Sequence, residues 1–97
     1  MENLTTKELI LDLSTDLSRI GLFALQNNEN RVQQFMKLSR EAVAELTKRK
    51  LHPGFVWVIK QIHILTTEYH TSRVTPKELA DDAFTYSNIL IHRSGLI

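Results

Sequence analysis

Two histidines, His63 and His70, are the first candidates for metal or proton chemistry in this chain, and they lie one heptad apart. A helical metal pair normally spaces its histidines four residues apart and needs a third ligand. Di-iron bundles place a glutamate three residues before a histidine, and that pattern occurs nowhere in the sequence. The spacing favours solvated or hydrogen-bonded histidines at a helix boundary. We therefore expect no metal site and no cofactor.

A histidine exposed on a helical bundle can also accept a phosphoryl group, and His63 is the candidate for that role. Phosphotransfer domains typically carry a lysine and a glycine shortly after the histidine, which leave room and positive charge for the phosphate. The residues from Ile64 to Glu68 are instead bulky and then acidic. A histidine phosphotransfer domain, or another helical-bundle enzyme, is therefore the third alternative for the function.

Two carboxylates, Asp12 and Asp16, lie four residues apart, and Arg19 follows one turn later. Carboxylates on one helix face can share a proton or hold a magnesium ion. The simpler interpretation is an ion pair between Asp16 and Arg19 on a solvated edge. The chain contains no nucleophile elbow, P-loop or glycine-rich dinucleotide turn. We therefore expect no enzymatic activity.

The segment 75–80 reads Thr-Pro-Lys-Glu-Leu-Ala and resembles the opening of a helix-turn-helix, whose first helix often reads Glu-Leu-Ala. The resemblance implies a DNA-binding regulator with a degenerate helix-turn-helix near residues 75–93. The turn of that motif generally has glycine four residues after the alanine, where this chain has Phe84. The segment also carries few basic groups, and phosphate contacts normally need several. DNA binding is therefore the alternative function, and we do not expect nucleic acid as a partner.

Helix start and stop signals divide the chain into four segments. Thr5 and Glu8 form a capping box, and Asn30 is positioned to cap the next helix. Pro53 suits the first turn of a third helix, and residues 75–78 give the strongest start signal. Gly95 is expected to close the last helix in a Schellman arrangement, with Leu96 folded back on Ile91. The predicted helices are 6–26, 31–50, 53–72 and 76–93.

The short connections between these segments make successive helices antiparallel neighbours. The sequence therefore predicts an all-α fold, an antiparallel up-and-down four-helix bundle, in one domain that spans residues 1–97. A three-helix core with one displaced terminal helix is the alternative. Gly21 lies inside the first helix, where glycine is less favourable than alanine, so we expect it to allow a close helix approach.

Several large apolar residues fall outside the stripes that face the core. Trp57 and Ile64 lie one heptad apart, roughly opposite the main apolar stripe of the third helix. Phe84 and Ile91 widen the apolar arc of the fourth helix in the same way, whereas Leu11 and Leu22 are more simply ordinary surface leucines. Such surplus positions normally mark contacts between proteins. The predicted partner interface therefore consists of Trp57, Ile64, Phe84 and Ile91.

The composition argues against proteins that bind nucleic acid or membranes and against secreted proteins. Twelve basic and eleven acidic residues leave a net charge of +1, so no strong field favours nucleic acid or an anionic membrane. The chain has no cysteine, no apolar stretch long enough to span a bilayer and no signal-peptide pattern, and we expect a cytoplasmic protein. The sequence predicts a small non-enzymatic interaction module that forms a homo-oligomer or binds a protein partner through helices 53–72 and 76–93.

Overall fold

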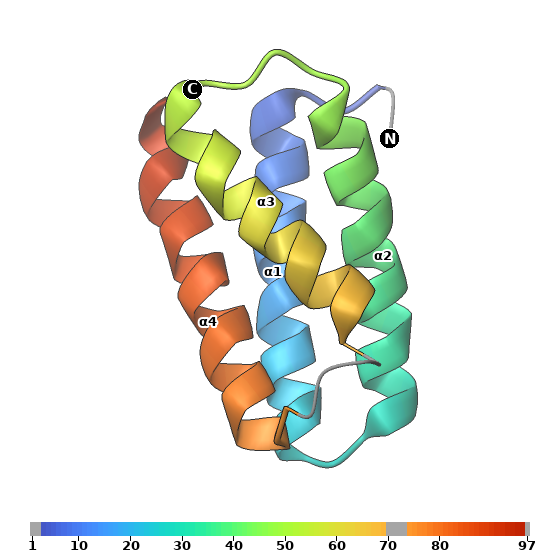
Figure 1. The fold of residues 1–97 in the computed structure, drawn as a ribbon. Helices are drawn as coiled ribbons and strands as arrows, with labels where there is room; N and C mark the ends of the chain where they lie inside the picture. Colours follow the sequence, from blue (N-terminus) through green and yellow to red (C-terminus); the bar gives the residue numbers. More distant parts are fainter. Residues whose placement is uncertain (1–2, 70–73, 97) are drawn as a thin grey trace.

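The computed structural model describes residues 3–69 and 74–96, which form four helices and a short 3₁₀ turn (Figure 1). Successive helices run in opposite directions, so the predicted up-and-down four-helix bundle is confirmed. The elements are α1 (Thr6–Leu25), α2 (Glu29–Thr47), α3 (Pro53–Glu68), α4 (Pro76–Arg93) and η1 (Ser94–Leu96).

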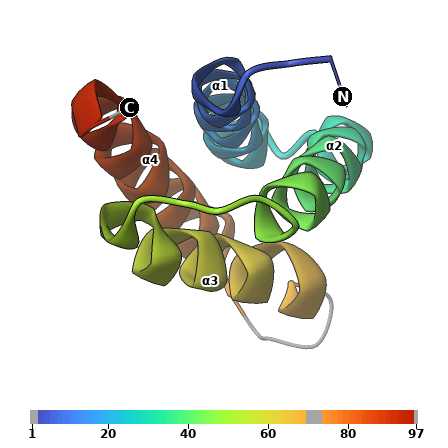
Figure 2. The same cartoon turned by 90° about the horizontal axis from the view of Figure 1, so that it is seen from above.

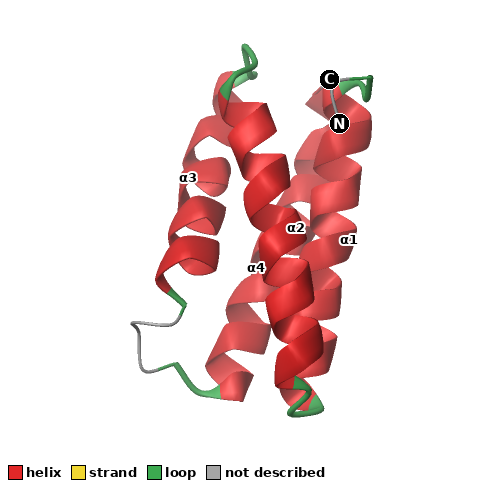
Figure 3. Ribbon diagram, turned by 90° about the vertical axis from the view of Figure 1, so that its right-hand side faces the viewer, coloured by secondary structure: helices red, strands yellow, loops and turns green. Residues whose placement is uncertain are grey.

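Helix α1 lies between α2 and α4, and α3 covers the opposite side of that pair (Figure 2). A view from the side shows α3 and α1 on opposite sides of the molecule (Figure 3). Helix α3 is tilted against the other three and is held at both ends. Arg93 of α4 donates a hydrogen bond to the carbonyl oxygen of Gly54, and the Tyr69 hydroxyl donates one to Glu29 of α2 at 3.0 Å. The diagonal course of α3 therefore exposes its outer face along the whole helix.

Helices α1 and α4 pack closely because small residues line their contact. Ser87 donates its hydroxyl hydrogen to the carbonyl oxygen of Ser14 at 2.7 Å. Its oxygen lies 2.8 Å from that of Ser18, which is therefore the donor of that second bond. A Cβ on Gly21 would lie 2.7 Å from the Phe84 ring, so the close approach predicted at Gly21 is confirmed.

The turn between α1 and α2 is tighter than predicted. Asn27 takes a positive φ of 56°, and the amides of Asn27 and Asn28 donate to the carbonyl oxygens of Ala24 and Phe23. This is a Schellman motif with asparagine in the left-handed position. Because it reverses the chain within two residues, the side chain of Asn28 caps α2, and the prediction of Asn30 as the cap was wrong.

The predicted ends of the other helices need correction in two places. Helix α2 ends at Thr47 rather than residue 50, since the chain then turns across the end of the bundle toward α3. Helix α4 continues into η1 instead of a Schellman turn, because the described glycines have no positive φ. The Leu96 side chain lies against Gly54 of α3. The predicted end of the third helix at residue 72 lies outside the described residues.

Candidate functional site

The outer face of α3 carries the largest exposed aromatic group among the described residues. The buried face of this helix is apolar, and its buried residues are Phe55, Val58, Ile59, Ile62 and Thr66. At 100° per residue, Trp57 and Ile64 fall on the opposite side. Their exposed fractions are 53% and 37%, so both predicted outward positions are exposed in the single chain.

The Trp57 indole makes one aromatic contact, with Tyr86 of α4. The ring centroids are 6.4 Å apart and the planes meet at 75°, which is an edge-to-face arrangement. Burial raises the pKa of the Tyr86 hydroxyl, and the nearby Asp82 carboxylate raises it further. We call Trp57, Ile64 and Tyr86 together the Trp57 surface.

A hollow of about 380 Å³ opens beside the Trp57 surface, between α3 and α4. Its floor is apolar, and its charged lining residues are all acidic. We call it the acidic hollow, and it is lined by Gln61, Ile64, Leu65, Glu68, Val74, Glu78, Asp82 and Tyr86.

A second hollow, of about 400 Å³, lies on the other flank of α3, toward the end of α2. Its floor is also apolar, but its ionisable lining residues are lysine, arginine and histidine. We call it the basic hollow, and it is lined by Thr47, Arg49, Leu51, Val56, Ile59, Lys60 and His63. The outer face of α3 therefore separates two hollows of similar size and opposite charge.

The other two predicted interface residues belong to a different part of the molecule. Phe84 is half-buried and packs its ring on Gly21 of α1, whereas Tyr86 contacts Trp57 of α3. Two residues span about 200° around a helix, so these side chains lie on opposite flanks of α4. Ile91 is 49% exposed and lies one heptad from Phe84, on the same flank. The structure therefore places Trp57 and Ile64 on one exposed face of α3 and leaves Phe84 and Ile91 on the α1 side.

Sequence patterns missed two contributors to this site. Tyr86 fits the core stripe of α4 but is only half-buried, because it lies at the edge toward the tilted α3. Val56 fits no stripe and is 58% exposed beside the basic hollow. The run of five apolar residues from Phe55 to Ile59 was the available signal, since such a run must place at least one side chain outside a single stripe.

The histidines that the structure describes are separate from one another in their roles. His52 caps α3, with its Nδ1 accepting a hydrogen bond from the Gly54 amide at 3.0 Å. His63 is exposed and lines the basic hollow, and His70 lies outside the described residues. Within residues 3–69 and 74–96, no three histidine, aspartate or glutamate side chains are grouped to hold a metal ion.

The predicted ion pair between Asp16 and Arg19 is not formed in the described structure. The Arg19 guanidinium lies 5.3 Å from the centroid of the Phe35 ring instead. Burial raises the pKa of Asp16 to about 6, and Asp12 adds to the rise while Arg19 opposes it. Asp16 is therefore a half-buried carboxyl that takes up a proton at a higher pH than a solvated aspartate.

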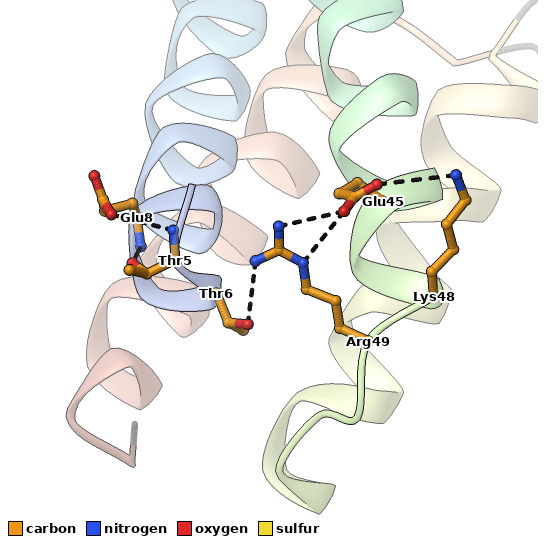
Figure 4. A network of polar contacts seen from close by, with 6 residues as sticks. All are labelled: Thr5, Thr6, Glu8, Glu45, Lys48 and Arg49. Carbon is orange, nitrogen blue, oxygen red and sulfur yellow. Dashed lines mark hydrogen bonds and ion pairs between the residues drawn. The ribbon is translucent and has the colours of Figure 1, made fainter. Parts of the chain in front are cut away.

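The basic residues after α2 have a structural use that the sequence did not reveal. Arg49 is half-buried, and its Nε and Nη2 donate to Glu45 Oε1 at 3.4 and 3.3 Å (Figure 4). Its Nη1 donates to the Thr6 hydroxyl of α1 at 3.3 Å, and Lys48 lies 3.9 Å from the other oxygen of Glu45. This network ties the end of α2 to the start of α1, so most of the positive charge of Arg49 is compensated within the chain.

Residues 76–93 form one uninterrupted helix, so the turn of a helix-turn-helix is not formed there. Phe84 occupies the position of the expected turn glycine and packs on α1. No helix among the described residues is long and apolar enough to cross a membrane. Comparison of the chain with protein-family models, with curated proteins and with solved structures finds no significant match in any of the three.

Proposed function

We propose that this chain is a small non-enzymatic interaction module that binds protein through the Trp57 surface. The observation that carries the proposal is the half-exposed indole of Trp57, which shares the outer face of α3 with Ile64, a lining residue of the acidic hollow. Buried aromatic anchors dominate the binding energy of many protein interfaces, and large exposed apolar patches normally mark such contacts.

The site favours protein binding over catalysis because its chemistry is sparse. The polar side chains of the acidic hollow are the Tyr86 phenol, the Gln61 amide and three carboxylates, and the described residues bring no nucleophile and base within hydrogen-bond reach there. The chain contains no cysteine, which fits a cytoplasmic setting, and we include that setting in the proposal.

The experiment compares the wild-type chain with a Trp57→Glu variant by light scattering at micromolar concentration. We expect the wild type to associate and the variant to be monomeric, because the contact would have to bury the introduced charge without a partner. Leu25→Glu is the matched control, since Leu25 has the same exposed fraction of 53% but lies at the end of α1. Clean monomers for both the wild type and Trp57→Glu would contradict the proposal.

A second pair of variants separates this surface from general apolar exposure. Ile64 and Leu38 are both 37% exposed, but Leu38 lies on α2. We expect Ile64→Glu to weaken association and Leu38→Glu to leave it unchanged. Equal effects of the two substitutions would show that the association does not depend on the outer face of α3.

A further inference from the structure

We propose that the partner is a second copy of this chain, with the two α3 helices packed parallel to each other about a two-fold axis that lies along them. This inference rests on the proposed function, because it names what covers the Trp57 surface. The feature that carries it is the opposite charge of the acidic and basic hollows on the two flanks of α3.

The acidic flank owes its charge to α4. Glu78 and Asp82 lie one helical turn apart, both are exposed, and both line the acidic hollow. In the described part of the chain neither of them forms an ion pair, whereas their neighbour Asp81 pairs with Lys77 at 3.2 Å. Two carboxylates therefore remain available for a cation from another surface.

The basic flank has one cation that is available in the same way. Lys60 is exposed on α3 and makes no ion pair with any described residue. It lines the basic hollow together with Val56 and His63. Lys60 and Val56 thus form an exposed edge of the basic hollow that combines apolar surface with a positive charge.

Symmetry decides how these flanks meet in a dimer. A two-fold axis along α3 makes the helices parallel and sets the basic flank of each copy against the acidic flank of the other, as in a parallel coiled coil. A two-fold axis across α3 makes the helices antiparallel and sets each flank against the same flank of the other copy. The second arrangement brings carboxylates to carboxylates and Lys60 to Lys60. Only the parallel arrangement gives charge complementarity, and it gives it twice.

The positions of the charged groups along the axis of α3 agree with the parallel arrangement. Asp82 shares the acidic hollow with Gln61 and Leu65, so it lies near their level on α3. Lys60 precedes Gln61 by one residue, which is a rise of about 1.5 Å. Parallel helices related by this axis keep equal residue numbers at equal levels. Measured along the axis, Lys60 of one copy is then within about one helical turn of Asp82 of the other copy.

The apolar residues fit the same arrangement. Trp57 and Ile64 are one heptad apart, and heptad positions of parallel helices each pack beside their own counterpart. Both side chains would lie near the axis, with charged contacts on both sides of them. The dimer would then consist of a central apolar seam with an acidic-to-basic contact along each edge.

Charge exchange tests the arrangement in the full chain. We expect Lys60→Glu to weaken the dimer about tenfold or more, because it sets a carboxylate against Asp82 and Glu78. Adding Asp82→Lys to Lys60→Glu exchanges the charges of the two flanks and should restore the dimer. Lys7→Glu is the control with the same change in net charge, because Lys7 is exposed on α1, the helix that lies opposite α3 (Figure 2). A double variant that dimerises no better than Lys60→Glu alone would overturn the arrangement.

Cross-linking tests the direction of the helices, and the chain has no cysteine that would interfere. Ile64→Cys should form a covalent dimer with a short bis-maleimide, because the parallel arrangement places each residue 64 beside its counterpart. Leu38→Cys should not cross-link, although Leu38 and Ile64 have the same exposed fraction of 37% in the wild-type chain. A protein that still dimerises but does not cross-link through position 64 would contradict the parallel packing.

The outcomes separate this inference from the proposed function. A dimer that Trp57→Glu dissociates, but that ignores charge exchange and position 64, supports protein binding by the Trp57 surface and overturns the parallel arrangement. A wild-type chain that is monomeric throughout overturns both. Far-ultraviolet circular dichroism of each variant ensures that loss of association is not loss of the fold.

Discussion

The effect of Gly21→Ala on the free energy of unfolding should change sign when Phe84 is also replaced by alanine. Two terms of opposite sign act on Gly21→Ala in the wild-type chain. Alanine is favoured over glycine inside a helix by about 1 kcal/mol. The new Cβ would lie 2.7 Å from Phe84 Cε1 and Cζ and 3.0 Å from Cδ1, which is closer than carbon atoms pack. Crowding of this kind costs about 1–3 kcal/mol.

The net effect of Gly21→Ala in the wild type is therefore a loss of up to about 2 kcal/mol in the free energy of unfolding. In a Phe84→Ala background the crowding is absent, so Gly21→Ala should stabilise the chain by about 1 kcal/mol. The difference between the two backgrounds is a coupling energy of about 1–3 kcal/mol, as expected for residues in direct contact.

Urea unfolding followed by circular dichroism measures all four chains of this cycle. Gly95→Ala is the control, because a Cβ there would meet nothing within 4 Å and the residue has no positive φ. Stabilisation by Gly21→Ala of about 1 kcal/mol in both backgrounds would refute the reasoning, since it would mean that the Phe84 ring does not lie on Gly21.

Two further predictions concern α1 and the turn that follows it. Burial raises the pKa of Asp16 from 3.8 to about 6, so the unfolded chain loses this proton at lower pH than the folded chain. The stability that this group contributes is complete below pH 3.8 and is lost as the pH rises to about 6. Asp16→Asn should remove that fall and raise the urea midpoint at neutral pH, and an unchanged pH profile would contradict the assignment. Asn27→Ala should lower the free energy of unfolding by about 1–2 kcal/mol, because alanine tolerates the positive φ poorly. Asn27→Gly should leave that free energy unchanged or raise it, as measured by urea unfolding. Equal stability of these two variants would contradict the left-handed conformation of Asn27.

Much of the fold follows from local signals that act within one or two turns. The capping box of Thr5 and Glu8 is formed, and α4 has the bounds predicted from Thr75 and Pro76. The turn after α1 was less predictable, because two adjacent asparagines can each take the left-handed or the capping position. Asn27 takes the first and Asn28 the second, which shortens the connection and moves the start of α2.

The candidate site was predictable only in part, because helix phase shows which residues leave the core stripe but not where neighbouring helices lie. Phase alone placed Trp57 and Ile64 outward, and both are exposed. The same reasoning treated Phe84 as outward, although α1 covers that flank and Gly21 makes room for the ring. The pairing of Trp57 with Tyr86 depends on the tilt of α3, which no local pattern encodes.

Quenching of tryptophan fluorescence by acrylamide tests the central claim most directly, because Trp57 is the only tryptophan in the chain. The indole is half-exposed in the single chain, and we propose that association covers it. We expect the quenching constant to fall as the protein concentration rises through the range in which light scattering reports association. A quenching constant that stays unchanged across that range would contradict the account, because the complex would then form through another surface.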